Sequence, residues 1–397
     1  MEKKALSFDV ITDNITKQLD SSRQNWLFGA GISFESNIPL MIPLTKRIGS
    51  IIDGSGQTKN IEIYKAISSE LDEKCHIEHI LSHLGDLIAI ATRSKSKSSS
   101  IASQSYNQSE LANLHGCIIE AIGETVRYGY SHNGTIELIG KQEEPIVEIE
   151  HHQNFVKAIF ANRSNLLSRS KLTFFSTNYD TLLEDALALE KYTVIDGFSG
   201  GAIGYWNPVQ EFQNNHSHPN RCLLYKLHGS IDWQRDKNSG LVRTRYGTKY
   251  LSKKSDIMIY PQATKYVETQ KDPFSFLFSG FRTALTQTDD NVLITCGYSF
   301  GDEHINAEIE TALALRNNAT TLIAFIQEAP DIDTGVVVNE RLDKWLADKE
   351  FHDRIYVAGK RGVYYKSTIP HQPANGADLM WWTFKGLTNF IKTNDYE

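Results

Sequence analysis

The sequence has few cysteines, and their spacing does not form a metal-binding pattern. Its 397 residues include only Cys75, Cys117, Cys222 and Cys296, with no Cys-x-x-Cys pair. This distribution excludes a structural zinc ribbon and is typical of a protein kept in a reducing compartment.

Long apolar runs are also missing. No stretch is long enough to cross a bilayer, and the N-terminal residues 1–6 lack the apolar core of a signal peptide. We therefore expect a soluble, cytoplasmic protein without membrane contact. The phosphate-binding pattern Gly-x-x-x-x-Gly-Lys-Ser/Thr is absent as well, so any ATPase activity must come from another protein.

An excess of positive charge is the third feature that the chain lacks. Its net charge of −7 argues against direct nucleic-acid binding. One stretch, 235–254, is locally basic. A contact with nucleic acid or an acidic partner and a solvated hairpin both fit this stretch, and the hairpin is the simpler reading.

The hydrophobic pattern that is present predicts an α/β protein. Short apolar runs alternate with segments of helical spacing, which indicates a Rossmann-like, doubly wound, mostly parallel sheet. Much of 55–168 has helical spacing and predicts an inserted helical subdomain, and the polar run 94–109 predicts a mobile loop. The expected division is a first Rossmann-like part, the helical subdomain, the rest of the Rossmann-like domain and a C-terminal α/β extension, at 1–54, 55–168, 169–326 and 327–397.

The rest of the chain is organised around a glycine turn. The apolar run Trp26–Phe28 ends in Gly29-Ala30-Gly31, with Ser33 just beyond it. Glycines at such a turn let the backbone approach a phosphate, and the following helix start favours negative charge. An ordinary strand-to-helix turn would have the same sequence.

Three further motifs begin where a predicted strand ends. Ligands of doubly wound sheets bind beyond the carboxyl ends of the strands, so motifs placed there can share one crevice. The four motifs, including the glycine turn, are Gly29–Ser33, Thr177–Asp180, His228–Ser230 and Gly297–Ser299.

Polar side chains in these motifs suggest chemistry on a sugar. The Asn178 amide both donates and accepts, so it can hold a ribose hydroxyl and a water. The imidazole of His228 can take a proton near neutral pH. Asp180 also fits the N-cap of the next helix, Asn178 fits a turn residue, and a lone histidine is often only a satisfied polar group.

Taken together, the motifs resemble the sirtuin-like family, and most of all its bacterial branch that hydrolyses NAD in anti-phage defence. The likeness extends over about 24–326. It is carried, in the family's order, by Gly29-Ala30-Gly31-Ile32-Ser33, Thr177-Asn178-Tyr179-Asp180, Lys226-Leu227-His228-Gly229-Ser230 and Gly297-Tyr298-Ser299-Phe300-Gly301-Asp302.

The resemblance implies an NAD site with assigned roles. Asn178 would hold the nicotinamide ribose and the attacking water, and His228 would be the base. Asp180 corresponds to the acidic residue of the family's Asn-x-Asp motif. The remaining cofactor-binding positions are the pyrophosphate loop, with Gly29, Ala30, Gly31 and Ser33, and the adenosine side, with Gly297 and Ser299.

Two departures from the deacylating sirtuins favour hydrolysis of NAD itself. The four-cysteine zinc module is absent, so no metal is expected, and Ile38-Pro39 is followed by Leu40-Met41 instead of Asp-Phe-Arg. We expect an NAD+ glycohydrolase that acts as a homo-oligomer and is restrained until assembly or a partner, such as a HerA-like DNA-translocating ATPase, activates it. An NAD-dependent protein deacylase and a non-catalytic NAD or ADP-ribose sensor are the alternatives.

Overall fold

The structure is a computed structural model of the whole chain. It describes residues 7–72, 74–101, 103–133, 136–162, 172–213, 220–236, 240–245, 256–259, 272–350 and 352–396.

An eight-stranded sheet forms the centre of the molecule, with the order β17-β16-β15-β14-β1-β6-β10-β7. Neighbouring strands are parallel except for β17, which is antiparallel to β16. The predicted α/β class with a mostly parallel sheet is therefore confirmed. The strands are β1 (Gln24–Phe28), β6 (Thr173–Ser176), β7 (Thr193–Ile195), β10 (Arg221–Lys226), β14 (Asn291–Cys296), β15 (Thr320–Phe325), β16 (Ile355–Ala358) and β17 (Val363–Tyr365).

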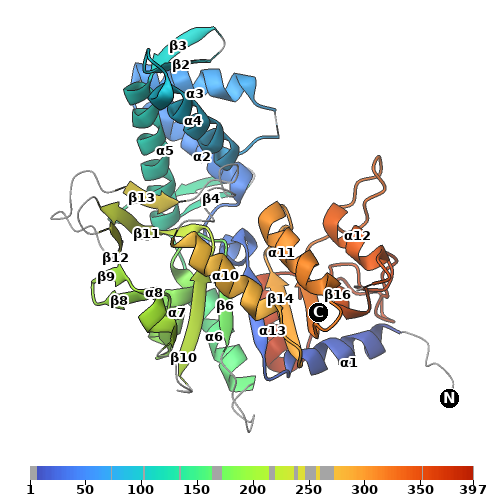
Figure 1. Cartoon of the computed structure of the whole chain (residues 1–397). Helices are drawn as coiled ribbons and strands as arrows, with labels where there is room; N and C mark the ends of the chain where they lie inside the picture. The colour runs from blue at the N-terminus through green and yellow to red at the C-terminus, as the bar shows by residue number, and fades with distance from the viewer. Residues whose placement is uncertain are drawn as a thin grey trace.

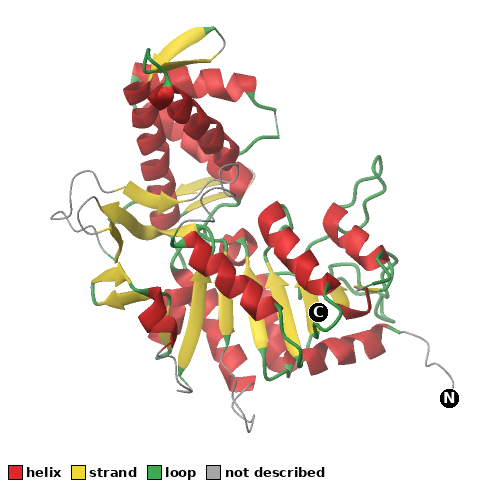
Figure 2. Cartoon of the chain, in the orientation of Figure 1, coloured by secondary structure: helices red, strands yellow, loops and turns green. Residues whose placement is uncertain are grey.

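The central strands β1, β14 and β15 are buried along their whole length because helices cover both faces of the sheet. Every residue of β1 is buried, and its side chains alternate between two cores. Trp26 and Phe28 pack on one face and Leu27 on the other. The first face is covered by α1 (Phe8–Leu19), α6 (Glu150–Asn162), α7 (Leu182–Leu189) and α13 (Phe384–Thr393), and the second by α10 (Phe274–Leu285), α11 (Glu303–Ala314) and α12 (Glu340–Ala347) (Figures 1 and 2).

A separate lobe follows the glycine turn, and we call it the helical block (Figure 1). It has its own apolar core, in which Tyr106 and Ile101 are buried. Both residues lie in a hairpin, so the expectation of a loop over 94–109 was wrong: the polar sequence conceals two side chains that anchor the hairpin to the core. The block consists of α2 (Met41–Gly54), α3 (Thr58–Glu70), α4 (Ile77–Arg93), α5 (Gln108–Tyr128), β2 (Ser98–Ile101) and β3 (Gln104–Asn107).

A second, five-stranded antiparallel sheet lies between the helical block and the central sheet (Figure 1). Its order is β13-β11-β12-β9-β8. β11 and β12 pair antiparallel, and only the end of β11 and the whole of β12 lie in the basic stretch 235–254. Residues 237–239 and 246–254 of that stretch lie outside the described residues. The strands are β8 (Phe198–Gly200), β9 (Ile203–Trp206), β11 (Gly229–Asp236), β12 (Gly240–Thr244) and β13 (Asp256–Ile259).

Short elements complete the fold. The glycine turn continues into a 3-10 helix, η1 (Ala30–Ser36), before α2 begins. The other short elements are β4 (Tyr130–Asn133), β5 (Ile136–Ile139), α8 (Pro208–Gln213) and η4 (His352–Arg354).

The strand order places a switch point at β1. The chain builds β6, β7 and β10 on one side of β1 and then crosses to β14, β15 and β16 on the other. A crevice at the carboxyl ends of the strands is expected at such a point.

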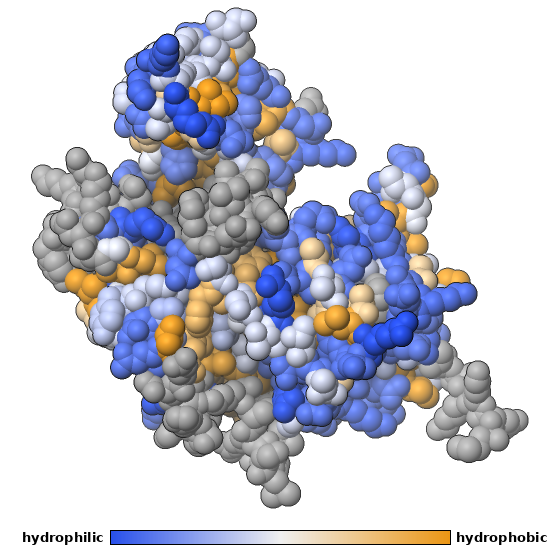
Figure 3. Space-filling view, viewed as in Figure 1, coloured by the Kyte–Doolittle hydropathy of each residue, from blue (hydrophilic) through white to orange (hydrophobic). Residues whose placement is uncertain are grey.

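No helix within the described ranges combines the length and the apolar character needed to span a lipid bilayer. Figure 3 shows mostly hydrophilic residues on the visible side of α11 and α12.

Candidate functional site

All four motifs lie at one edge of the central sheet, where backbone hydrogen bonds join them. The first N–H groups beyond β1, β6 and β10 each donate to the last residue of a neighbouring strand: Gly29 to Cys296 at 3.1 Å, Thr177 to Phe28 at 3.0 Å and Leu227 to Ser176 at 2.8 Å. The ends of β14, β1, β6 and β10 therefore form one continuous row.

The glycine turn packs directly against the turn after β14. A Cβ on Gly29 would lie 2.4 Å from the carbonyl oxygen of Gly297, and a Cβ on Gly31 would lie 2.6 Å from the Gly297 Cα. Gly297 itself has a φ of +63°, which favours glycine. The N–H of Gly31 donates to the Gly297 carbonyl at 3.0 Å. Gly29 and Gly31 thus already use their N–H groups within the protein, and their contribution to a ligand would be shape.

A buried hydrogen-bond chain links the glycine turn to the motif after β6. The Ser33 hydroxyl donates to Asp180 Oδ2 at 2.8 Å and accepts from Asn178 Nδ2 at 3.1 Å. Asp180 Oδ1 accepts the N–H of Leu182, the first residue of α7, at 3.0 Å. The N-cap of α7 is Thr181, so the expectation of Asp180 at that position was wrong by one residue. The Asp180 carboxylate still accepts the first N–H of the helix and joins the polar cluster.

This chain fixes the orientation of the Asn178 amide. A serine hydroxyl has one proton, and Ser33 gives it to the Asp180 carboxylate, so Ser33 can only accept from the Asn178 NH2 group. The other amide atom, Oδ1, is buried and accepts no hydrogen bond from the described residues. A buried acceptor without a partner is costly, and a hydroxyl donor of a ligand would satisfy it.

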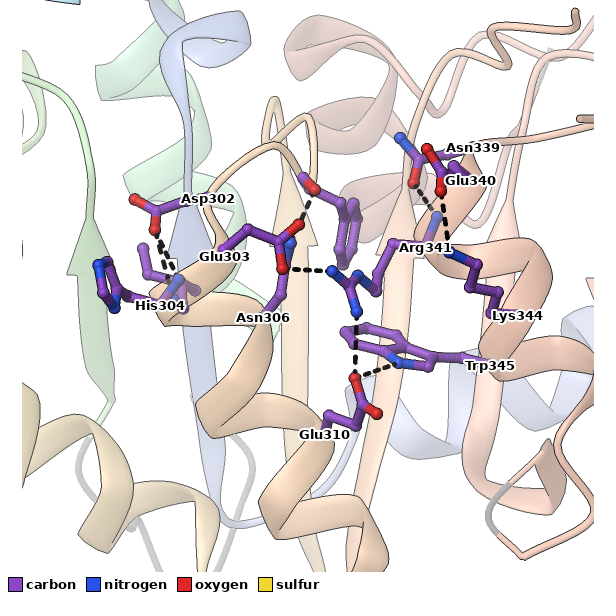
Figure 4. Close-up of polar contacts among 12 residues, drawn as sticks. Asp302, Glu303, His304, Asn306, Glu310, Asn339, Glu340, Arg341, Lys344 and Trp345 are labelled. Atoms are coloured by element: carbon purple, nitrogen blue, oxygen red, sulfur yellow. Dashed lines mark hydrogen bonds and ion pairs between the residues drawn. The ribbon is translucent and has the colours of Figure 1, made fainter. Parts of the chain in front are cut away.

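The His228 ring contacts the carboxylate of Asp302, a residue that follows the strand at the opposite end of the row. Its Nε2 lies 2.8 Å from Asp302 Oδ2, and both side chains are buried. When the neutral ring donates from Nε2, the basic lone pair is on Nδ1. Asp302 Oδ1 also caps α11 by accepting the N–H groups of His304 and Ile305 (Figure 4).

The His228–Asp302 pair bridges the ends of β1 and β6. His228 follows β10 and Asp302 follows β14, and these two strands are separated by β1 and β6 in the sheet. Burial raises the pKa of Tyr179, and the carboxylates of Glu78 and Asp302 add to that shift. The carbonyl of Tyr179 accepts the N–H of Ile231 at 3.0 Å and the hydroxyl of Ser230 at 3.2 Å, just after His228. Since Tyr179 is the neighbour of Asn178 in the chain, the segments that carry Asn178 and His228 are hydrogen-bonded to each other.

The buried ammonium group of Lys226 holds the Asn178–Asp180 segment in place. The Lys226 ammonium lies 3.3 Å from Glu184 Oε1 and donates to the carbonyl of Asp180. Burial raises the pKa of the Glu184 carboxyl to about 7, although Lys226 opposes this shift. The backbone of the Asn178–Asp180 turn is therefore tied to both β10 and α7.

A second buried histidine lies beside the site. His152 Nδ1 is 3.4 Å from the Ser36 hydroxyl at the end of η1, and its ring packs against Phe384. Burial lowers the pKa of His152 to about 4, and the nearby carboxylate of Asp180 opposes that shift.

The remaining predicted positions lie nearer the surface. Ala30 and Gly31 are half-buried at the start of η1, and Gly297 is half-buried opposite them. Ser299 is exposed, and its hydroxyl accepts the N–H of Gly301 at 3.4 Å. Ser299 thus belongs to the rim of the site, apart from the Ser33–Asn178–Asp180 cluster.

Two residues of the site could not be assigned from motifs alone. Asp302 has the sequence signal of a helix cap, which conceals its second contact with His228. His152 shares a helical stripe with Phe155, Val156 and Ile159, and all four are buried. That spacing is the signal that could have placed this histidine inside the protein.

The described residues contain no cluster of metal ligands. Within the described residues, no three His, Cys, Asp or Glu side chains lie in a group that could hold a metal ion. The four cysteines are free, and two of them, Cys222 and Cys296, are buried in the central sheet.

The arrangement defines a doubly wound α/β protein with a polar site at the carboxyl ends of its strands. Residues 172–352 match the family model of the SIR2-like domain. The matched stretch includes Asn178, Asp180, His228 and Asp302 and does not extend to the glycine turn.

Comparisons with other known proteins add little beyond this match. No curated protein matches the chain. Among solved structures, a mutant Sir2 homologue in complex with ADP-ribose is 13% identical, with a TM-score of 0.35, over 83% of this chain and 88% of that chain. A Sir2 homologue in complex with NAD is 14% identical, with a TM-score of 0.34, over 82% and 85%.

The glycine contact generates a stability prediction. Gly297→Ala is expected to lower the free energy of unfolding by about 2 kcal/mol or more, because its Cβ would lie 2.4 Å from the backbone nitrogen of Ile32. Gly335→Ala is the matched control, since Gly335 has a similar φ of +72° but open space around it, and should cost only about 1 kcal/mol. Urea unfolding measures both, and equal losses would contradict the packing argument.

His152 generates a prediction about pH. Its folded pKa of about 4 lies below the usual value, so the unfolded chain binds the extra proton first and stability falls as pH decreases from about 6.5 towards 4. In His152→Gln the loss of stability between pH 7 and pH 5 should be smaller by about 2 kcal/mol.

Urea unfolding at the two pH values tests this. The raised pKa of Glu184 makes the stability increase as the pH falls, which is opposite to the effect of His152. This contribution is present in both proteins and cancels when they are compared. His151→Gln, on the same helix, is the control and should behave like the unaltered protein. An unchanged pH dependence in His152→Gln would show that the buried ring is not the titrating group.

Proposed function

We propose that this protein is an NAD+ glycohydrolase, which cleaves the bond between nicotinamide and ribose to give nicotinamide and ADP-ribose. The observation that carries the proposal is the buried, unpartnered Asn178 Oδ1, whose amide is held by Ser33 in the same row of strand ends as the buried His228–Asp302 pair. An amide acceptor and an oriented imidazole in one row suit the binding of a ribose hydroxyl and the activation of water. The match to the SIR2-like domain supports the same substrate class.

The residues present can accommodate a dinucleotide. The close packing of Gly29 and Gly31 removes side chains from the turn where the pyrophosphate would lie, near Ala30 and Ser33. Gly297 and Ser299 would border the adenosine side. The substrate supplies a glycosidic bond whose leaving group, nicotinamide, departs as a neutral molecule.

In the proposed mechanism, the chain positions and deprotonates water. Asn178 Oδ1 accepts a hydrogen bond from a ribose hydroxyl or from the water, and this bond orients the group that donates it. Water oxygen forms a bond to the anomeric carbon, the bond to the nicotinamide nitrogen breaks, and nicotinamide keeps the electron pair. His228 accepts the water proton at Nδ1, and the charged ring is stabilised by Asp302. No step requires a metal.

We further propose that this activity is restrained in the cell. Unregulated loss of NAD would kill the host, so an effector of anti-phage defence has to be released by assembly into a homo-oligomer or by a partner such as a HerA-like DNA-translocating ATPase. Comparing nicotinamide release with and without the product of the neighbouring gene, and across protein concentrations, tests this. A full rate that no partner or oligomer changes would refute the restraint.

The catalytic assignment predicts the loss of turnover in two variants. Asn178→Ala and His228→Ala should each reduce nicotinamide release by about 100-fold or more, because each removes a group that acts on the reacting atoms. Asn389→Ala and His132→Ala remove the same side-chain types from exposed positions and should leave the rate unchanged.

Chromatographic detection of nicotinamide measures the rates. Turnover that persists in both site variants would refute the mechanism. Release of nicotinamide only when an acetyl-lysine peptide is present would indicate a deacylase instead. Tight ADP-ribose binding without turnover under any activating condition would indicate a sensor.

Asp302 offers a sharper test, because its two oxygens have separate roles. Asparagine is also a good helix cap, so Asp302→Asn should preserve α11 while removing the charge beside His228. We expect kcat to fall about tenfold or more with little change in unfolding free energy. A kcat equal to that of the unaltered protein would show that the imidazole does not depend on this carboxylate.

A further inference from the structure

Tyr179 lies between Asn178 and Asp180 in the chain, and its side chain enters the helical block. It belongs to the apolar core of that block, together with Leu182 and Ile231. Its hydroxyl donates a hydrogen bond to Glu78 Oε1 in the first turn of α4, and both side chains are buried. The neighbours on either side, Asn178 and Asp180, meet Ser33 instead.

The backbone of Tyr179 holds the second half of the site. Its carbonyl accepts the hydroxyl of Ser230 at 3.2 Å and the N–H of Ile231 at 3.0 Å, two and three residues after His228 respectively. The helical block reaches this strand as well, because Arg127 on α5 donates to the carbonyl of Ile231 at 3.4 Å. One tyrosine therefore contacts the segments that carry Asn178 and His228 and the lobe above them.

We propose that Tyr179 and Glu78 are positioning residues through which the helical block sets the geometry of Asn178 and His228. This inference rests on the proposed function, since it names the part of the fold on which the activity of that site depends. The hydroxyl–carboxylate bond fixes where the Tyr179 ring sits. The ring fixes the Asn178–Asp180 turn, and the carbonyl of Tyr179 fixes the start of β11.

A role in positioning predicts a specific kinetic pattern. Tyr179→Phe keeps the ring and removes only the hydroxyl, so kcat for NAD hydrolysis should fall about tenfold while KM stays within about twofold. Glu78→Gln keeps an oxygen that can accept the bond and should retain most of the rate, whereas Glu78→Ala should behave like Tyr179→Phe. The Tyr179→Phe/Glu78→Ala double variant should be no slower than either single one, because both remove the same contact.

The helical block supplies a matched control. Tyr106 is also buried in its core and donates to a glutamate, Glu62 Oε1, at 3.1 Å, but it lies in β3, at a distance from the site. Tyr106→Phe removes the same hydroxyl from the same lobe and should leave kcat and KM unchanged. If both tyrosine variants lost activity equally, general loosening of the block would explain the result and the positioning role would be refuted.

Hydrogen exchange tests the proposal without relying on activity. In Tyr179→Phe the amides of Ile231 and Leu182 should exchange about tenfold faster, while those of β15 stay protected and show that the fold is intact. The inference would be overturned if the exchange rates of these two amides in Tyr179→Phe equalled those in the unaltered protein and in Tyr106→Phe. That outcome counts against it whether or not the protein hydrolyses NAD. Faster exchange in a protein that hydrolyses NAD under no activating condition would instead leave the coupling standing and refute the proposed function.

Discussion

The close contact between two backbone turns is the constraint on which the site depends. Gly29 and Gly31 after β1 meet Gly297 after β14 without space for a Cβ on any of them. This contact brings the start of η1 down onto the sheet, which places the Ser33 hydroxyl within reach of the β6 motif. A side chain at any of the three positions would push η1 away and separate Ser33 from Asn178 and Asp180. The glycines that resemble a phosphate loop are therefore required first by the packing of the protein itself.

The polar groups of the site follow different strands of the row β14-β1-β6-β10, in which β1 and β6 are the inner strands and β14 and β10 the outer ones. Asn178 and Asp180 follow the inner strand β6, whereas His228 and Asp302 follow the outer strands β10 and β14 and meet above it. Both halves are buried, so each charge has a partner: Asp180 receives hydrogen bonds, and Asp302 faces an imidazole and a helix start. Two atoms are exceptions among the described residues of the site: Asn178 Oδ1 and the Nε2 of the neighbouring His152 are buried without a hydrogen bond. A buried polar atom without a partner is a typical mark of a ligand-binding position.

Sequence patterns predicted the secondary structure correctly where local hydrophobic periodicity alone decides whether a segment forms a strand or a helix. The predicted runs Trp26–Phe28, Asn291–Cys296 and Thr320–Ile326 coincide with the buried strands β1, β14 and β15 to within two residues at each end. Their alternation with helices predicts the sheet. The polar residues 94–109 were misread because Ile101 and Tyr106, only two side chains, hold the hairpin in the core. His152 was overlooked because a histidine beside another polar residue resembles a solvated surface, although its helical spacing matches the buried stripe.

The sequence by itself determined the α/β class and the position of four motifs at strand ends, because hydrophobic periodicity and glycine turns are local properties of the chain. Only the tertiary structure decided which polar atoms face one another. Asp302 is recognisable from the sequence as a cap, but its contact with His228 depends on the order β14-β1-β6-β10, which brings together residues more than 70 positions apart. The same holds for Tyr179 and Glu78, whose contact exists because the helical block folds back onto the edge of the sheet.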